Sequence, residues 1–164
     1  MDPEVLILRD PRESTRKCSL TPLRGRPGIV IIEYHPERTL DAAGRILLHP
    51  EAEVLTSGDA VGRDGAPGLL LLDCAWRRVD QLLSTVRGPL VRRALPLLKT
   101  AYPRRSRVFQ DPEAGLASVE ALYAARAILG QPCADLLNGY RWAEAFLKQN
   151  PTLNPTPNTA RNSF

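Results

Sequence analysis

The pattern of apolar and polar positions divides the chain into a strand-rich first part and a helix-rich second part. Short apolar runs that end at Pro, Gly or charged residues are typical of buried strands. They predict strands over residues 5–8, 28–34, 45–49 and 69–72, separated by loops that include 10–28 and 57–68. Further along, leucine and valine recur at spacings of three and four, which predicts helices over residues 77–86, 89–101, 115–129 and 132–149. Buried strands followed by helices indicate an α/β fold.

Turn residues refine the limits of these helices. Pro89 suits the first turn of a helix, where a missing N–H costs nothing, and Gly130 suits the end of one. Gly139 predicts a bend in the last helix. From Asn150 onward the chain is rich in Asn, Pro and Thr, which predicts a flexible tail over 151–164.

Positive charge gathers in the second part of the chain. The 164 residues carry a net charge of +4, mostly from arginine, and their length suits one domain. Between residues 77 and 107 there are many cations and one acid, Asp80; the arginines are Arg77, Arg78, Arg87, Arg92, Arg93, Arg104, Arg105 and Arg107. A solvated helix face could explain them, but the scarcity of acids favours RNA bound through phosphate contacts and stacking on Tyr102.

The sequence also argues against several classes of protein. No apolar run approaches the length that spans a bilayer, and no secretory signal is visible at the N-terminus, so we expect a cytoplasmic protein without membrane contact. Three separated cysteines favour a reducing compartment over a disulfide framework. The spacing of His35 and His49 matches no metal-ligand pattern, so no metal is expected. Walker, GxGxxG, GxSxG and HExxH motifs are absent.

Candidate chemistry centres on Asp73, which ends the run of four leucines. Ligands of α/β proteins bind at the carboxyl ends of parallel strands, so this acid could be a base or a positioning group. It could equally be the N-cap of a helix that begins near Ala75. Trp76 could line an aromatic pocket or pack in the core. The small residues at 115–118 offer backbone N–H groups to a carboxylate or phosphate, although a plain capped helix explains them as well.

Several segments, taken together, resemble the ribosome-biogenesis aminocarboxypropyltransferases, which modify small-subunit ribosomal RNA. The run 72–79 (LDCAWRRV) resembles their aspartate-cysteine-serine-tryptophan segment. Segments that are similar to other family motifs follow in the right order: Asp10-Pro11 with 17–19, then 47–50, 95–103, 116–121 and 140–150. Each motif is weak alone, but the match spans nearly all of residues 5–150.

The resemblance implies a SPOUT-like knotted α/β fold with a β-rich N-terminal part and a helical C-terminal part. It implies an RNA-binding-like part at 1–66, a cofactor-binding part at 67–150 and the tail at 151–164. It also implies that the 3-amino-3-carboxypropyl group of S-adenosylmethionine moves to a ring nitrogen of a uridine-derived base, leaving methylthioadenosine. The expected partner is small-subunit ribosomal RNA or a precursor subunit, and we expect a monomer.

The resemblance further assigns roles to particular residues. Asp73 would accept the proton of the attacking nitrogen, while Arg77, Arg78, Arg104, Arg105 and Arg107 would hold the RNA. The residues implied to bind the cofactor are Ser19, Leu48, Pro50, Trp76, Leu95, Leu116, Ser118 and Val119. A second alignment of the N-terminal motif replaces Ser19 by Thr15. Tyr102-Pro103-Arg104-Arg105 stands where the family often has asparagine-proline and a small polar loop, which leaves the target nucleotide open.

Two other functions share these features. A SPOUT-type methyltransferase would use the same cofactor and RNA but transfer the methyl group. A ribosome-assembly factor would bind RNA without catalysis.

Overall fold

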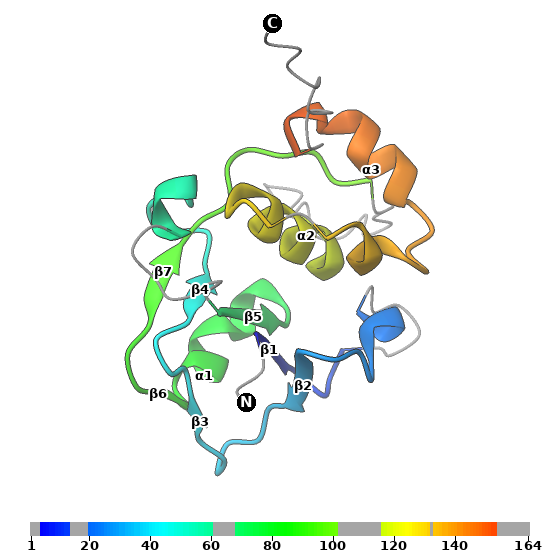
Figure 1. The fold of residues 1–164 in the computed structure, drawn as a ribbon. Coiled ribbons are helices and arrows are strands. Elements are labelled where there is room, and N and C mark those ends of the chain that lie inside the picture. Colours follow the sequence, from blue (N-terminus) through cyan, green and yellow to red (C-terminus); the bar gives the residue numbers. More distant parts are fainter. Residues whose placement is uncertain (1–3, 14–19, 61–67, 102–115, 132, 154–164) are drawn as a thin grey trace, which may run out of the picture.

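The core of the protein is a parallel β-sheet. The computed structural model describes residues 4–13, 20–60, 68–101, 116–131 and 133–153 (Figure 1). Five strands form the main sheet in the order β2-β1-β5-β4-β7, and every adjacent pair is parallel. Their bounds are β1 (Val5–Arg9), β2 (Ile29–Glu33), β4 (Ile46–Leu48), β5 (Leu69–Asp73) and β7 (Val91–Arg93). A separate parallel pair consists of β3 (Leu40–Asp41) and β6 (Val86–Arg87).

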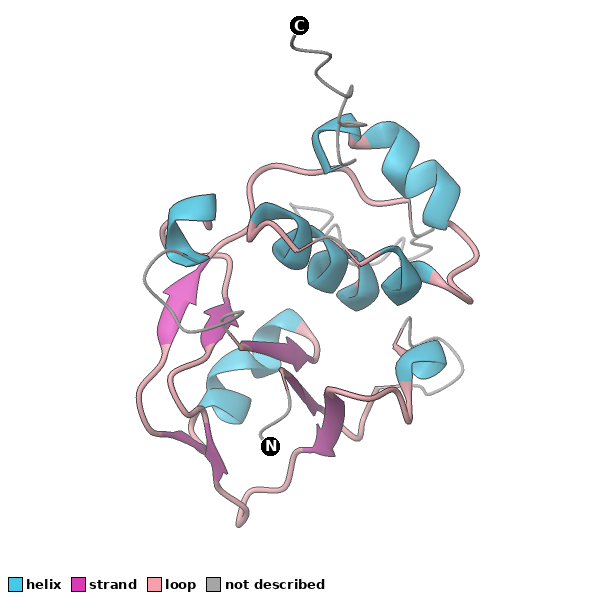
Figure 2. Cartoon of the chain, viewed as in Figure 1, coloured by secondary structure: helices cyan, strands magenta, loops and turns pink. Residues whose placement is uncertain are grey.

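Helices cover both faces of this sheet (Figure 2). The helices are α1 (Val79–Leu83), α2 (Ser118–Ile128) and α3 (Ala143–Gln149). Single 3-10 turns occur at η1 (Thr21–Leu23), η2 (Ser57–Ala60), η3 (Trp76–Arg78), η4 (Ala134–Leu137) and η5 (Pro151–Leu153).

Successive strand residues face opposite layers, as the pleat requires. In β1, Val5 and Ile7 belong to the large core that includes α2, whereas Leu6 and Leu8 face the side of α1 and the small sheet. Figure 1 places α2 between the sheet and α3, and the rings of Tyr123 and Phe146 meet edge to face there at 6.4 Å. The four consecutive leucines of β5 are therefore explained by helices and strands that cover both faces of the sheet.

The order of the strands determines where polar groups can gather. The first strand of the chain, β1, lies next to the edge strand β2, and β5 later inserts between β1 and β4. Because all five strands are parallel, their carboxyl ends share one edge. At that edge the N–H of Asp10 donates to the carbonyl of Asp73 at 2.9 Å, which joins the residues that follow β1 and end β5. The strand order changes direction here, the place where α/β sheets bind ligands.

The predicted strands are confirmed, but the helix predicted over 89–101 is wrong. Residues 91–93 instead form β7 in register with β4, and Ala94 bridges to Val54. Pro96 disfavours helical backbone at the residue before it and lacks an N–H. Just before β7, Gly88 has φ +82°, and an added Cβ there would lie 2.2 Å from Oδ1 of Asp41. The turn at Gly88 thus sends the chain from β6 into a strand.

Two other helices are shorter than predicted. The segment 77–86 contains η3 and α1, which ends at Leu83, and then enters β6. The segment 132–149 is divided into η4 and α3, because Gly139 adopts φ +81° and a helix cannot include that conformation. The helix predicted over 115–129 is confirmed as α2, with Gly130 in the left-handed conformation after it.

Strands from both sides of the predicted boundary at 66/67 share the main sheet, since β1, β2 and β4 pair with β5 and β7. The three-part division stays a prediction. Within the described residues, no helix combines the length and the apolar character needed to cross a membrane.

Candidate functional site

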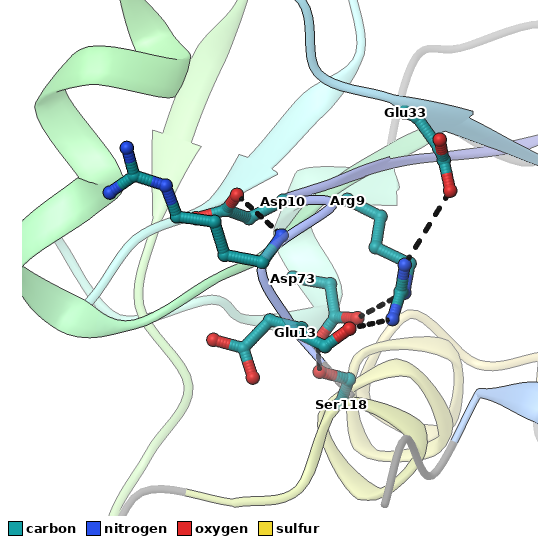
Figure 3. A network of polar contacts seen from close by, with 7 residues as sticks. Arg9, Asp10, Glu13, Glu33, Asp73 and Ser118 are labelled. Carbon is teal, nitrogen blue, oxygen red and sulfur yellow. Dashed lines mark hydrogen bonds and ion pairs between the residues drawn. The ribbon is translucent and has the colours of Figure 1, made fainter. Parts of the chain in front are cut away.

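Asp73 lies at the carboxyl edge of the sheet and faces the start of α2 (Figure 3). Its Oδ1 accepts a hydrogen bond from Oγ of Ser118 at 2.8 Å, and its Oδ2 lies 3.7 Å from Nε of Arg9. The side chain is 14% exposed. The alternative of Asp73 as an N-cap is wrong, because Ala75 occupies that position before η3. Asp73 is thus a half-buried carboxylate at the carboxyl edge of the sheet, the edge where α/β proteins bind ligands.

A second polar pair lies on the opposite face of the same edge. Oδ2 of Asp10 accepts a hydrogen bond from Nε of Arg78 at 2.8 Å, and its Oδ1 accepts one from the N–H of Arg12 at 3.0 Å. Burial alone would raise the pKa of Asp10, but the two hydrogen bonds and the Arg78 charge outweigh it, so the pKa lies below its ordinary value. Arg78 also donates to Gln81 and covers the ring of Tyr34. This pair connects the residue that follows β1 to η3.

Stability should therefore depend on pH through Asp10. A carboxyl whose pKa is lower in the folded state stabilises the fold above its unfolded pKa and loses that contribution as the pH falls. We expect Asp10→Asn to melt at a lower temperature than the unsubstituted protein at pH 7, with the difference shrinking below pH 3.8, the ordinary pKa. Thermal unfolding between pH 7 and pH 3 measures this, with the exposed Asp135→Asn as control. A difference that does not change with pH would contradict it.

Cys74 follows Asp73 but is unsuited to act as a nucleophile. Partial burial, together with the negative charges of Asp10, Asp73 and Glu13, raises the pKa of its thiol to about 12. The thiol therefore stays protonated at neutral pH, and a thiol attacks far more slowly than a thiolate. Burial and the same two aspartates also raise the pKa of Glu13.

The start of α2 is fixed by a buried carboxylate. Glu120 is fully buried and accepts hydrogen bonds from the N–H of Ala117 at 2.9 Å, the hydroxyl of Thr100 at 2.5 Å and the N–H of Ala101 at 2.9 Å. The N–H groups of a first helical turn have no partner inside the helix. The predicted carboxylate-binding residues Ser118 and Val119 are the first two residues of this turn. Glu120 therefore holds the turn in place.

The structure brings most of the predicted cofactor residues to this edge. Leu48 ends β4 and precedes Pro50, Leu95 follows β7, and Leu116 precedes α2. The three leucines are half-buried and pack on the core that includes α2. Trp76 is 55% exposed, and its ring lies 6.4 Å from that of His49, which places the end of β4 beside the residues after β5. Half-buried apolar side chains next to a helix start suit an adenosine-bearing ligand with a carboxylate.

The RNA-binding predictions have different outcomes in the structure. Arg77 is exposed, as an RNA contact requires. Arg78 is buried and bonded to Asp10, so its guanidinium serves the fold and we do not carry it forward as an RNA contact. Arg104, Arg105, Arg107, Ser19 and Thr15 lie outside the described residues. Among the described residues, no group of three His, Cys, Asp or Glu side chains is placed to hold a metal ion.

Sequence reasoning missed Arg9 and Glu120. Arg9 ends an apolar strand, where an arginine is usually solvent-exposed, yet its side chain is 1% exposed. The sequence does contain a signal for Arg9: the apolar run of β1 ends in an arginine and that of its parallel partner β5 ends in an aspartate, Asp73, so the two could pair. Glu120 follows Ala117 by three residues, the spacing of a capping box, but with alanine in place of a capping side chain.

Comparisons with known proteins identify a family and named relatives. A family model described as the C-terminal part of a ribosome biogenesis protein matches residues 46–162. A 16S rRNA aminocarboxypropyltransferase from Vulcanisaeta distributa is 31% identical over 156 residues, covering 90% of this chain and 77% of that protein. One of the same name from Methanosphaera stadtmanae is 31% identical over 120 residues, covering 72% and 68%.

A solved structure is similar as well. The SAM-dependent rRNA:acp-transferase Tsr3 from Vulcanisaeta distributa superimposes with a TM-score of 0.67 at 30% identity, covering 93% of this chain and 80% of that one. The family model covers most of this chain, and both relatives are 31% identical over more than two thirds of their length, so the chain belongs to the ribosome biogenesis family that includes the 16S rRNA aminocarboxypropyltransferases.

Proposed function

We propose that this protein is an S-adenosylmethionine-dependent enzyme that transfers the 3-amino-3-carboxypropyl group to small-subunit ribosomal RNA. The relatives are named for this activity, and each match covers most of both chains. The single observation on this chain that supports it best is the contact of Asp73 with Ser118, which joins a carboxylate to the first turn of α2. A base and a carboxylate-binding turn are thereby adjacent.

The residues of the site divide the work. Backbone N–H groups at Ser118 and Val119 hold the carboxylate of the amino acid part, and the half-buried leucines pack on the adenosine. When bound, S-adenosylmethionine would supply the methylene carbon of its aminocarboxypropyl group, activated by the adjacent sulfonium. The bond from this carbon to sulfur breaks as a bond to the ring nitrogen forms, which releases methylthioadenosine. Asp73 accepts the proton that the ring nitrogen of a uridine-derived base loses. Since the sulfonium is a good leaving group, the chain needs no nucleophilic side chain of its own.

The proposal includes a SPOUT-like knotted fold in a cytoplasmic monomer. The knotted fold, unlike the location and the monomeric state, has support in the path of residues 99–101, which are bonded to helices on two sides. Asn150, at the end of α3, exchanges hydrogen bonds of 2.8 Å with the backbone of Lys99. Glu120 of α2 binds the next two residues. A segment held between two helices in this way is compatible with a chain that passes through a loop.

Product analysis tests the reaction directly. The protein is incubated with S-adenosylmethionine and unmodified small-subunit RNA, and the products are identified by mass spectrometry. We expect methylthioadenosine and RNA heavier by one aminocarboxypropyl unit. S-adenosylhomocysteine with a methylated base would identify a methyltransferase. Cofactor binding without turnover would point to another RNA, and failure to bind the cofactor would favour an assembly factor.

RNA binding at the exposed Arg77 gives a separate prediction. We expect Arg77→Gln to weaken the binding of all RNA sequences to a similar degree. The slope of the logarithm of the RNA-binding constant against the logarithm of the salt concentration should fall by about one, because one phosphate contact is lost. Arg126→Gln is the matched control, since Arg126 pairs with Glu4 at the amino end of β1, at 3.2 Å. Titrations at several salt concentrations measure both. An unchanged slope for Arg77→Gln would remove that contact.

A further inference from the structure

Three charged side chains form one row across the sheet. The register pairs Arg9 of β1 with Glu33 of β2 on one side and with Asp73 of β5 on the other. Residues in register on adjacent strands point to the same face. For these three it is the α2 face, because Ile7, Ile31 and Leu71, two positions earlier in each strand, pack on the core that contains α2. Arg9 therefore stands between two carboxylates.

Arg9 is almost fully buried, so these neighbours, rather than water, interact with its guanidinium group. Its side chain is 1% exposed. Nη1 lies 3.6 Å from Oε1 of Glu33, Nε lies 3.7 Å from Oδ2 of Asp73, and Nη2 donates to the carbonyl of Glu13 (Figure 3). Glu33 is 60% exposed, so water screens that pair, whereas Asp73 is 14% exposed. The contact with Asp73 is the less screened of the two.

The same contacts restrict Asp73. Ser118 binds one of its oxygens and Arg9 faces the other, so the carboxylate is held from α2 on one side and from β1 on the other. A base held in one orientation acts faster than one that samples several, because the cost of ordering it is already met in the folded protein.

We propose that Arg9 is a positioning residue for Asp73, which keeps the carboxylate aimed at the ring nitrogen of the RNA substrate. The proposal rests on the proposed transferase function and adds to it a residue from a strand that carries none of the predicted site residues. Arg9 does not touch the reacting atoms; it acts through Asp73. Its removal should therefore lower turnover at saturating S-adenosylmethionine more than it changes cofactor affinity.

A double-mutant cycle tests this. Turnover of small-subunit RNA is measured for the unsubstituted protein, Arg9→Met, Asp73→Asn and the double variant, and S-adenosylmethionine affinity is measured by calorimetry. We expect Arg9→Met to lower kcat by about tenfold when Asp73 is present and to have little effect when Asp73→Asn is present, because the two residues act as one unit. Arg126→Met removes another arginine from an ion pair, at the opposite edge, and should leave kcat unchanged.

The outcomes separate the two proposals. An unsubstituted protein that binds the cofactor but forms no aminocarboxypropyl product on any small-subunit RNA overturns the proposed function and this role with it. Transfer by the unsubstituted protein with equal losses from Arg9→Met in both backgrounds overturns the role of Arg9 alone. If Arg9→Met does not fold, Arg9→Lys keeps the charge but not the fork of donors, and the same cycle is run with it. If Arg9→Lys lowers kcat when Asp73 is present but not when Asp73→Asn is present, the role is again supported. If it lowers kcat equally in both backgrounds, the role is again overturned.

Discussion

Asp73→Asn is expected to lower the rate of aminocarboxypropyl transfer by about 10²- to 10⁴-fold, the usual contribution of a positioned general base. The amide oxygen can still accept the hydrogen bond of Ser118, so the start of α2 keeps its contact with β5. What is lost is the ability to take a proton from the substrate. Single-turnover rates at saturating S-adenosylmethionine measure the chemical step, and calorimetry measures cofactor affinity, which should change far less.

Asp135→Asn is the matched control, because it removes the same charge from an exposed position on η4. It should transfer at the unsubstituted rate. If Asp73→Asn transfers at nearly the full rate while it is folded and binds the cofactor, Asp73 is not the base, and the proton leaves to water or to the RNA. A loss of cofactor affinity as large as the loss of rate would instead give Asp73 a binding role.

The sequence predicts the sheet better than it predicts the helices. Strands such as β2 and β5 are runs of apolar residues that end at polar or turn-forming residues. This pattern is local, so it can be recognised without knowing which strands pair with them. The segment 89–101 also has apolar residues at helical spacing, but pairing with β4 decides its structure. A strand partner that lies more than forty residues earlier in the chain leaves no local signal.

The candidate site shows the same limit. The position of Asp73 after a buried strand is a local feature, and resemblance to a family identified both it and Ser118. That the two side chains touch could not be read from the sequence, because the contact joins β5 to a helix 45 residues further along. Arg78 is the converse case: it belongs to a cluster of arginines in the sequence, yet its partner Asp10 lies 68 residues away.

Glu120→Gln is expected to destabilise the protein by about 2–3 kcal/mol, the cost of leaving a buried donor without its acceptor. The carboxylate serves three donors, from Ala117, Thr100 and Ala101. An amide has one acceptor oxygen, and its NH₂ group would face a donor. For a chain of this size the melting temperature should fall by about 5–10 °C. Thermal unfolding measures it, with Glu144→Gln, an exposed acid in the first turn of α3, as the control.

The consequences of Glu120→Gln should extend to binding. Glu120 fixes the first turn of α2, where the cofactor carboxylate is proposed to bind, so S-adenosylmethionine affinity should fall even below the melting temperature. It also bonds to Ala101, just before the stretch 102–115, and to Ala117, two residues after it; that stretch holds three of the arginines predicted to contact RNA. RNA affinity should therefore fall together with cofactor affinity. A variant that melts early but binds both ligands normally would show that Glu120 stabilises the fold without shaping the site.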